Sequence, residues 1–319
     1  MPTAVVAIGG NSLIRAGEKG TIAEQMANVR RTADALVALI AEGYDLVITH
    51  GNGPQVGAAL LRSERAADEA YRLPLDVCVA ATQGEIGYLL QQALAERLSF
   101  AGLKRPVVSL LTQVVVAKDD PAMTNPTKPI GPFYTQRDAE VRRAQFGWAV
   151  VDDAARGWRR VVPSPRPIEI IEESAIRTLV RSGALVIACG GGGIPVVREN
   201  GHFTGVDAVI DKDSASRLLA LRLQADLLVM ATGVDRVYVD YRRPGQRALD
   251  EIDAAELRQL YDAGHFPPGN MGPKIAAALA FVEQGSGRAL ITSYERLLDG
   301  IHGKAGTHVV RARAVTGRR

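Results

Sequence analysis

Strand-like and helix-like segments alternate along most of this 319-residue chain, and this alternation restricts its fold more than any other feature. Apolar runs of strand length occur at 3–8, 45–50, 226–232 and 288–292, with helical patterns between them. Strands joined by helical crossovers run parallel, and the crossover helices cover both faces of their sheet. The sequence therefore predicts an α/β protein with a mostly parallel, buried sheet.

The remaining elements follow from periodicity and from turn residues. The predicted helices lie at 21–42, from residue 75 onward, and at 170–181, 213–223, 254–262 and 273–284. The further strand-rich segments lie at 106–117, 184–189 and 307–312. The turn "ENGH" at 199–202, flanked by apolar residues, indicates a hairpin.

Residues 118–167 interrupt the alternation. This segment is rich in proline and holds both tryptophans, Trp148 and Trp158. It is too long for an ordinary connection, so we predict an inserted subdomain, with strands of its own, that acts as a lid. The predicted organisation is one domain over 1–313 that contains this insertion, followed by a basic tail over 314–319.

The overall composition favours a soluble protein that does not bind nucleic acid. The 38 Lys and Arg residues nearly balance 35 Asp and Glu residues, which leaves a net charge of only +3. Cys78 and Cys189 are too few for a disulfide framework or a zinc site. The apolar start lacks the basic region of a signal peptide, and no apolar run is long enough to cross a bilayer. We therefore expect a cytoplasmic protein without membrane contact.

Three glycine-rich turns follow predicted strands, at 9–11 ("GGN"), 51–55 ("GNGPQ") and 190–193 ("GGGG"). Glycine lets the backbone approach a ligand closely and direct several N–H groups at it. The carboxyl ends of parallel strands are where ligands bind in open α/β sheets. A polyphosphate site is predicted there, although neither a P-loop motif nor a G-x-G-x-x-G motif occurs.

Two lysines stand at the predicted starts of helices, where the partial positive charge of the helix disfavours cations. Lys212 opens one helix, and Lys274 follows Pro273, which suits the first helical position. An anion bound between these lysines would reverse the unfavourable interaction; otherwise they are ordinary surface lysines. Either Asp211 or Asp213 can cap the first helix, and the sequence does not decide which.

Glycine turns, cations and the lack of an evident nucleophile suit phosphoryl transfer, which depends on positioning and charge neutralisation. Magnesium would then be held mainly through nucleotide phosphates, without dedicated protein ligands. Lys128, in the proline-rich loop "NPTKPIGPFY", is a third candidate cation, although its spacing alone favours an exposed loop lysine.

An ordered series of motifs resembles the carbamate kinases of the amino acid kinase family. The motifs are "VVAIGGNSL", "HGNGPQVG", "TQGEIGY", "DPAMTNPTKPIGPFY", "GWRRVVPSPRP", "IACGGGGIPV", "GVDAVIDKDSAS" and "GNMGPK". The resemblance implies a three-layer αβα sandwich around a largely parallel eight-stranded sheet, with 118–167 as a small protruding subdomain. It also implies a homodimer that transfers phosphoryl groups reversibly between ATP and carbamate, giving ADP and carbamoyl phosphate. The resemblance further implies that Mg²⁺ binds together with ATP or ADP, and that the enzyme is used to form ATP from carbamoyl phosphate.

The resemblance also implies roles for single residues. Lys212 and Lys274 stabilise the transferring phosphoryl group, Asp213 holds these lysines, and Lys128 reaches from the lid toward carbamoyl phosphate. The implied phosphate-side residues are Gly9, Gly10, Asn11, Gly51, Asn52, Gly53, Gly191 and Gly192. The implied nucleotide-side residues are Thr232, Val234, Tyr238 and Met271.

Three other functions compete with this interpretation. A kinase of the same fold could act on another acid, although the sequence of the insertion argues against it. A nucleotide-binding regulator without catalysis is disfavoured by the retention of all three lysines and Asp213. A dinucleotide oxidoreductase is disfavoured because its glycine motif is missing.

Overall fold

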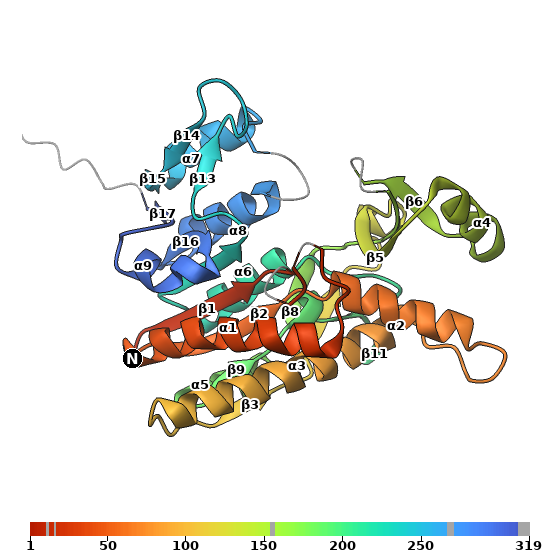
Figure 1. The fold of residues 1–319 in the computed structure, drawn as a ribbon, viewed down its shortest axis with the longest axis horizontal. Coiled ribbons are helices and arrows are strands. Elements are labelled where there is room, and N and C mark those ends of the chain that lie inside the picture. The colour runs from red at the N-terminus through yellow and green to blue at the C-terminus, as the bar shows by residue number, and fades with distance from the viewer. Residues whose placement is uncertain (11–12, 16, 154–156, 267–270, 312–319) are drawn as a thin grey trace, which may run out of the picture.

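The central element of the computed structural model, which describes residues 1–10, 13–15, 17–153, 157–266 and 271–311, is an eight-stranded sheet (Figure 1). Its strand order is β15 (Glu251–Asp253), β17 (Thr307–Val310), β16 (Arg288–Ser293), β12 (Leu227–Thr232), β1 (Thr3–Ile8), β2 (Asp45–His50), β9 (Leu185–Ile187) and β3 (Val107–Ser109). Neighbouring strands are parallel except β16 and β17. The predicted, largely parallel eight-stranded sheet is therefore confirmed.

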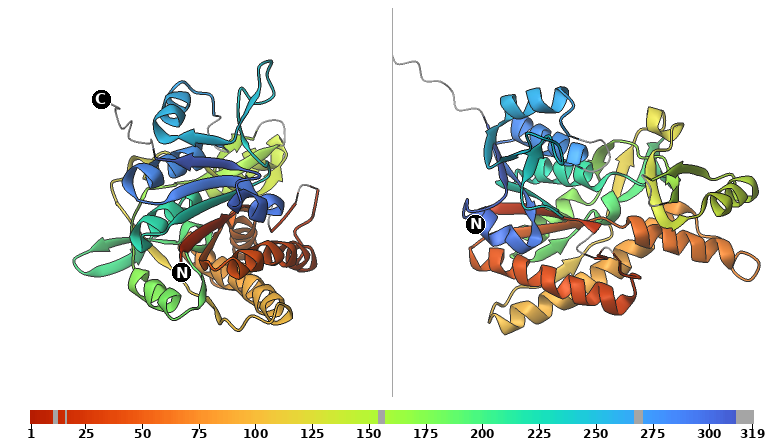
Figure 2. Two further views of the ribbon diagram at one scale, coloured as in Figure 1. Left: turned by 90° about the vertical axis from the view of Figure 1, so that its left-hand side faces the viewer. Right: turned by 45° about the horizontal axis from the view of Figure 1, so that its top comes forward.

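Helices cover both faces of this sheet (Figure 2). One face packs against α1 (Ile22–Ala41), α3 (Leu75–Phe100) and α9 (Leu297–Ile301). The other face packs against α5 (Glu173–Arg181), α6 (Lys212–Leu223), α7 (Ala254–Asp262) and α8 (Met271–Gln284). Along β1, Val6 belongs to the first of these cores and Val5 to the second, as the alternation of side chains along a strand requires. The three-layer αβα arrangement is confirmed.

The helix predicted at 21–42 is α1, and its start is fixed by local chemistry. Thr21 accepts a hydrogen bond from the backbone N–H of Glu24, and the Glu24 carboxylate accepts from the N–H of Thr21. These reciprocal bonds satisfy two of the donors that a helix start leaves without partners. The sequence therefore places this helix to within one residue at each end.

The helix that follows β2 was absent from the prediction. The segment "GNGP", which we interpreted only as a turn, opens α2 (Gly53–Arg65), with Pro54 in its first turn. Proline lacks the N–H that a first-turn residue does not need, so it starts this helix instead of preventing it. The prediction of a single strand-rich segment at 106–117 was also too coarse, because β3 and β4 (Gln113–Val116) belong to different sheets.

A four-stranded sheet lies beside the central one. Its order is β11 (His202–Gly205), β10 (Ile194–Glu199), β4 and β8 (Pro167–Ile170). The hairpin predicted at "ENGH" is confirmed, since β10 and β11 are antiparallel around Asn200 and Gly201, which both have positive φ. A two-stranded sheet joins β13 (Val237–Val239) and β14 (Arg247–Leu249). The short helices are η2 (Pro121–Met123), η3 (Gly190–Gly192) and η4 (Tyr294–Arg296).

Residues 118–167, predicted as an insertion and referred to below as the inserted subdomain, contribute a small unit that projects from the body beside α2 (Figure 1). It contains an antiparallel sheet of β5 (Lys128–Tyr134), β7 (Trp158–Val162) and β6 (Ala149–Asp152), together with α4 (Gln136–Phe146). The predicted basic tail, 314–319, lies outside the described residues. Throughout the part of the chain that is described, no helix has both the length and the apolarity needed to cross a bilayer.

Candidate active site

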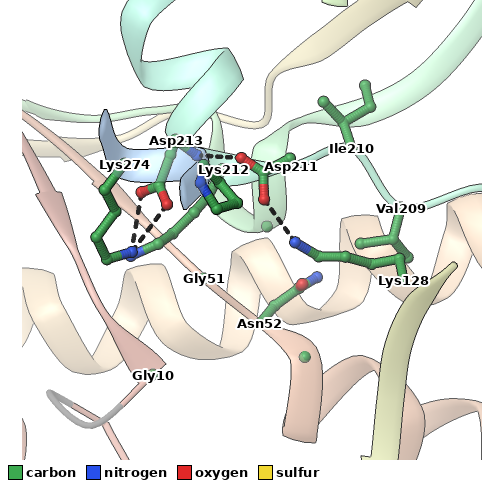
Figure 3. Close-up of a pocket in the computed structure, with 13 residues that line it drawn as sticks. Gly10, Gly51, Asn52, Lys128, Val209, Ile210, Asp211, Lys212, Asp213 and Lys274 are labelled. Atoms are coloured by element: carbon green, nitrogen blue, oxygen red, sulfur yellow. Dashed lines mark hydrogen bonds and ion pairs between the residues drawn. The ribbon is translucent and has the colours of Figure 1, made fainter. Parts of the chain in front are cut away.

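A cavity of about 210 Å³ lies where β1 and β2 end, opposite the start of α6 (Figure 3). Elements far apart in the sequence contribute to it, including both glycine turns after these strands and the first residues of α6 and α8. Its described lining comprises Gly10, Gly51, Asn52, Gly53, Lys128, Gly191, Val209, Ile210, Asp211, Lys212, Asp213, Pro273 and Lys274. The position matches the carboxyl-end location that α/β sheets use for ligands.

Lys212 is the first residue of α6, and its side chain turns toward the end of β1. Its Nζ donates a hydrogen bond to the carbonyl oxygen of Ile8 at 2.9 Å and lies 3.7 Å from Oδ1 of Asp213. Only 13% of the side chain is exposed. This ammonium group is therefore held in one position at the cavity, whereas the side chain of a lysine at an exposed helix start would be free to move.

Lys274 and Asp213 form a buried ion pair beside it. The Nζ of Lys274 donates to Oδ2 of Asp213 at 2.8 Å, and the two side chains are 10% and 5% exposed. Oδ1 of Asp213 is buried and has no hydrogen-bond partner among the residues that the structure describes. One carboxylate thus lies between two ammonium groups, hydrogen-bonded to one and in longer contact with the other.

Asp211 connects α6 to the inserted subdomain. Its Oδ1 accepts hydrogen bonds from the backbone N–H groups of Asp213 and Ser214, so Asp211 is the N-cap. Its Oδ2 accepts from Lys128 Nζ at 2.6 Å. Burial alone would raise the pKa of Asp211, but the Lys128 ammonium and the Ser214 N–H outweigh it and lower this pKa to about 2. The choice of N-cap that the sequence left open is thereby decided, which leaves Asp213 for the lysines.

The cavity carries more positive than negative charge. Three ammonium groups, from Lys128, Lys212 and Lys274, face two carboxylates, from Asp211 and Asp213. Burial lowers the pKa of Lys212 to about 8; Asp213 opposes this shift and Lys274 adds to it. An anion in the cavity would replace the water that these ammonium groups have lost and would favour their charged forms. The arrangement is suited to a phosphoryl group.

The glycines around the cavity are required by close contacts. A Cβ atom on Gly191 would lie 2.2 Å from Nδ2 of Asn52, and one on Gly192 would lie 2.3 Å from the carbonyl oxygen of Ile210. Gly191 and Gly192 also have positive φ, which favours glycine. Nδ2 of Asn52 donates to Oγ1 of Thr82 at 2.9 Å, which fixes the orientation of the amide.

Comparison with known proteins agrees with this geometry. Residues 2–293 match the amino acid kinase family. The chain belongs to that family. It is 48% identical over 315 residues to a carbamate kinase of Thermococcus kodakarensis, a match that covers 98% of this chain and 100% of the relative. It is 49% identical over 312 residues to the carbamate kinase-like protein YahI of Escherichia coli, covering 96% and 98% of the two chains.

A solved structure gives the same result in three dimensions. The carbamate kinase of Giardia lamblia bound to AMP-PNP superimposes on this amino acid kinase with a TM-score of 0.90 and 43% identity. The match covers 97% of this chain and 98% of the Giardia chain. Within the amino acid kinase family, this chain therefore groups with the carbamate kinases, as the motifs indicated.

The kinase brings together most, but not all, of the residues that the sequence singled out. Gly9 and Gly192 are not among the described lining residues, although a Cβ atom on Gly9 would lie 3.8 Å from Nζ of Lys212. Asn11 lies outside the described residues. The predicted nucleotide-side residues are not among the described residues that line this cavity: Thr232 ends β12, Val234 follows it, Tyr238 lies in β13 and Met271 starts α8. Their nucleotide role stays a prediction.

Several residues of the kinase that shape the site had no assigned role in our sequence analysis. Gln83 donates to the carbonyl oxygen of Gly190 at 2.9 Å and accepts from the N–H of Thr112, which holds the third glycine turn in place. His50 is buried under the same turn, and burial lowers its pKa to about 4, so it is neutral near pH 7. A signal was available for both residues, because Gln83 lies in the motif "TQGEIGY" and His50 is the first residue of "HGNGPQVG".

Proposed function

We propose that this amino acid kinase transfers a phosphoryl group from carbamoyl phosphate to ADP, forming ATP and carbamate, in a reversible reaction. The bond between the carbamoyl oxygen and phosphorus breaks, and an oxygen of the β-phosphate of ADP forms the new bond. The observation that carries the proposal is the convergence of three lysine ammonium groups on one cavity of about 210 Å³. The similarity to carbamate kinases supports the choice of substrate.

The proposed roles follow from the position of each charge. Lys212 and Lys274 neutralise the phosphoryl oxygens, whose charge is spread over three atoms in a loose transition state. Asp213, bonded to Lys274 at 2.8 Å and 3.7 Å from Lys212, keeps the two ammonium groups at fixed positions. Lys128, which comes from the inserted subdomain, contacts the carbamoyl end of the substrate. Preorganised charge of this kind lowers the barrier without reorganisation during the reaction.

Magnesium fits this site as a companion of the nucleotide. The carboxylates of Asp211 and Asp213 already hold Lys128 and Lys274, so they offer no cage of oxygen ligands. Over the described ranges, no group of three or more His, Cys, Asp or Glu side chains is arranged to hold a metal ion. Mg²⁺ bound to ADP or ATP keeps most of its waters and would neutralise phosphate charge.

The remaining proposals concern assembly and location. We propose that the kinase acts as a homodimer in the cytoplasm. The exposed apolar side chains of Val77 and Tyr88 lie eleven residues apart, on the same face of α3, and support burial of this face in an interface. Light scattering after size-exclusion chromatography tests the dimer, since a single peak with the mass of one chain, 34.1 kDa, would contradict it.

The decisive experiment measures ATP formation from carbamoyl phosphate and ADP with Mg²⁺, beside acetyl phosphate as the alternative acyl phosphate. We expect carbamoyl phosphate to be strongly preferred and Lys212→Ala to lower turnover by at least about 100-fold. Near-normal turnover of Lys212→Ala would refute the assigned site. Preference for acetyl phosphate would instead indicate a kinase for another acid, an alternative that the similarity to a carbamate kinase-like protein keeps open.

A further inference from the structure

Glu64 is a buried acid at an unfavourable position in its helix. It lies in the last turn of α2, where the partial negative charge of the helix end disfavours a carboxylate. Its side chain is only 5% exposed, and in the described part of the chain no group donates a hydrogen bond to its Oε2. Helix stability therefore does not explain this residue, and its contacts outside α2 must be considered.

The carboxylate contacts two side chains of the inserted subdomain. Oε1 of Glu64 accepts hydrogen bonds from Nη1 of Arg160 at 2.7 Å and from Nε1 of Trp148 at 3.2 Å. The Arg160 guanidinium also stacks on the Trp148 ring, 4.7 Å from a ring centroid. A charge-assisted bond shielded from water and reinforced by stacking is stronger than an exposed ion pair. We call this group the Glu64 contact.

The Glu64 contact is linked to Lys128 by one rigid sheet. Arg160 lies opposite Ile130 in the pairing of β7 with β5, and Lys128 lies two residues before Ile130 on the same strand. A strand rises about 3.3 Å per residue, so the two positions are separated by about 7 Å along β5. A shift of Arg160 relative to α2 is therefore transmitted directly to Lys128.

A second contact between α2 and β5 is a close packing of the two backbones. A Cβ atom on Gly57 would lie 1.9 Å from Cα of Gly131, so the two backbones touch. Next to the Glu64 contact, a cavity of about 730 Å³ is lined by Leu60 and Glu64 of α2 and by Trp148 and Arg160 of the inserted subdomain. Val56 and Leu60 of α2 also belong to a buried hydrophobic cluster with Ile130 of β5. The Glu64 contact adds a charged interaction to this apolar packing.

We propose that Glu64 is a positioning residue that holds the inserted subdomain against α2 and thereby keeps Lys128 in the active site. The inference rests on the proposed function, because it assigns Lys128 to the binding of carbamoyl phosphate. It predicts that Glu64 affects this substrate and not ADP. It also predicts that Glu64 acts only through Lys128.

The test is a double-mutant cycle of Glu64→Ala and Lys128→Ala in the ATP-forming assay, with KM measured for each substrate. Glu64→Ala should raise KM for carbamoyl phosphate by about tenfold or more and leave KM for ADP within about twofold. In the Lys128→Ala background, Glu64→Ala should have no further effect, because coupled residues are non-additive. Glu69→Ala, which removes an exposed glutamate just after α2, is the matched control and should resemble wild type.

Two further variants keep the test independent of the folding of Glu64→Ala. Arg160→Met removes the other charge of the contact and should give the same separation of the two KM values. Glu64→Gln, which retains an acceptor oxygen, should restore most of the activity. In a Trp158→Phe background, emission from Trp148 should shift to longer wavelength in Glu64→Ala and remain unshifted in Glu69→Ala.

Each result bears on the inference separately from the proposed function. An active wild type with additive effects of Glu64→Ala and Lys128→Ala would overturn the role of Glu64 and leave the proposed function standing. Equal changes in both KM values would also overturn it, since they indicate general damage. A wild type inactive toward carbamoyl phosphate would refute the proposed function, and the inference would fall with it.

Discussion

Replacing Lys212 by methionine should stabilise the folded protein at pH 7 while removing its activity. Methionine has a similar length and no charge. The lysine side chain is 13% exposed, and burial is the main cause that lowers its pKa from 10.5 to about 8. At about 1.4 kcal/mol for each pKa unit, keeping the ammonium charged in the folded state destabilises it by about 3 kcal/mol.

Part of this gain is offset by lost contacts. The pKa shift already includes every effect on the charged form relative to the neutral amine. Only the contacts that a neutral amine would make, and that methionine lacks, remain to be subtracted from the value of about 3 kcal/mol. The main one is the hydrogen bond to the carbonyl oxygen of Ile8 at 2.9 Å. Losing it costs about 1 kcal/mol, so the free energy of unfolding of Lys212→Met should exceed that of wild type by about 2 kcal/mol.

The sign of the pH dependence provides the critical check. Between pH 8 and 10.5 the unfolded chain binds more protons at Lys212 than the folded protein does. Wild type therefore gains stability as the pH rises through this range, and its difference from Lys212→Met should shrink and then change sign by about pH 10.5, when only the lost hydrogen bond to Ile8 remains. Urea unfolding at pH 7, 9 and 10.5 measures this difference, with Lys104→Met at an exposed position as control. A variant less stable than wild type at pH 7, with an unchanged difference at pH 10.5, would refute the reasoning.

Three further predictions concern the active site and the contact between α2 and β5. Since the ammonium form of Lys212 is required, kcat/KM should fall about tenfold per pH unit above about pH 8; a pH–rate profile measures this, and Lys212→Arg should remove the decline. Asp213→Asn leaves the buried Lys274 without its carboxylate and should lower the free energy of unfolding by about 3 kcal/mol in urea, whereas the exposed Asp68→Asn should not. Gly57→Ala forces a Cβ to within 1.9 Å of Gly131 and should raise KM for carbamoyl phosphate about tenfold, while Gly84→Ala, with no atom within 4 Å, should leave it unchanged; equal effects of the two alanines would contradict this.

Most of the fold was predictable because its signals are local. The apolar runs that became β1, β2, β12 and β16 are continuous in sequence, and buried parallel strands require such runs. The start of α1 was predictable from the Thr21 cap. The helix α2 was missed because glycine and proline favour a turn and a helix start equally well, and the choice depends on packing against β5.

The site was predictable only where position within a single element revealed it. Lys212 and Lys274 were found because a cation at a helix start is locally unfavourable. The pairing of Lys128 with Asp211 joins residues 83 positions apart, and no periodicity records which loop folds over which helix. Asp211 had been considered only as a cap, since nothing in its neighbourhood indicates that its second oxygen binds a lysine.

The positions of these lysines explain why the chain retains an unfavourable group. The folded protein without ligand keeps Lys212 buried, with a pKa of about 8, next to two other cations. A phosphoryl group between them would favour the charged form, so its binding and the protonation of Lys212 are thermodynamically linked. Above about pH 8, binding of the phosphorylated substrate should therefore be accompanied by proton uptake. Lys212 thus lowers the folding stability of the free protein but raises its affinity for the phosphoryl group that it transfers.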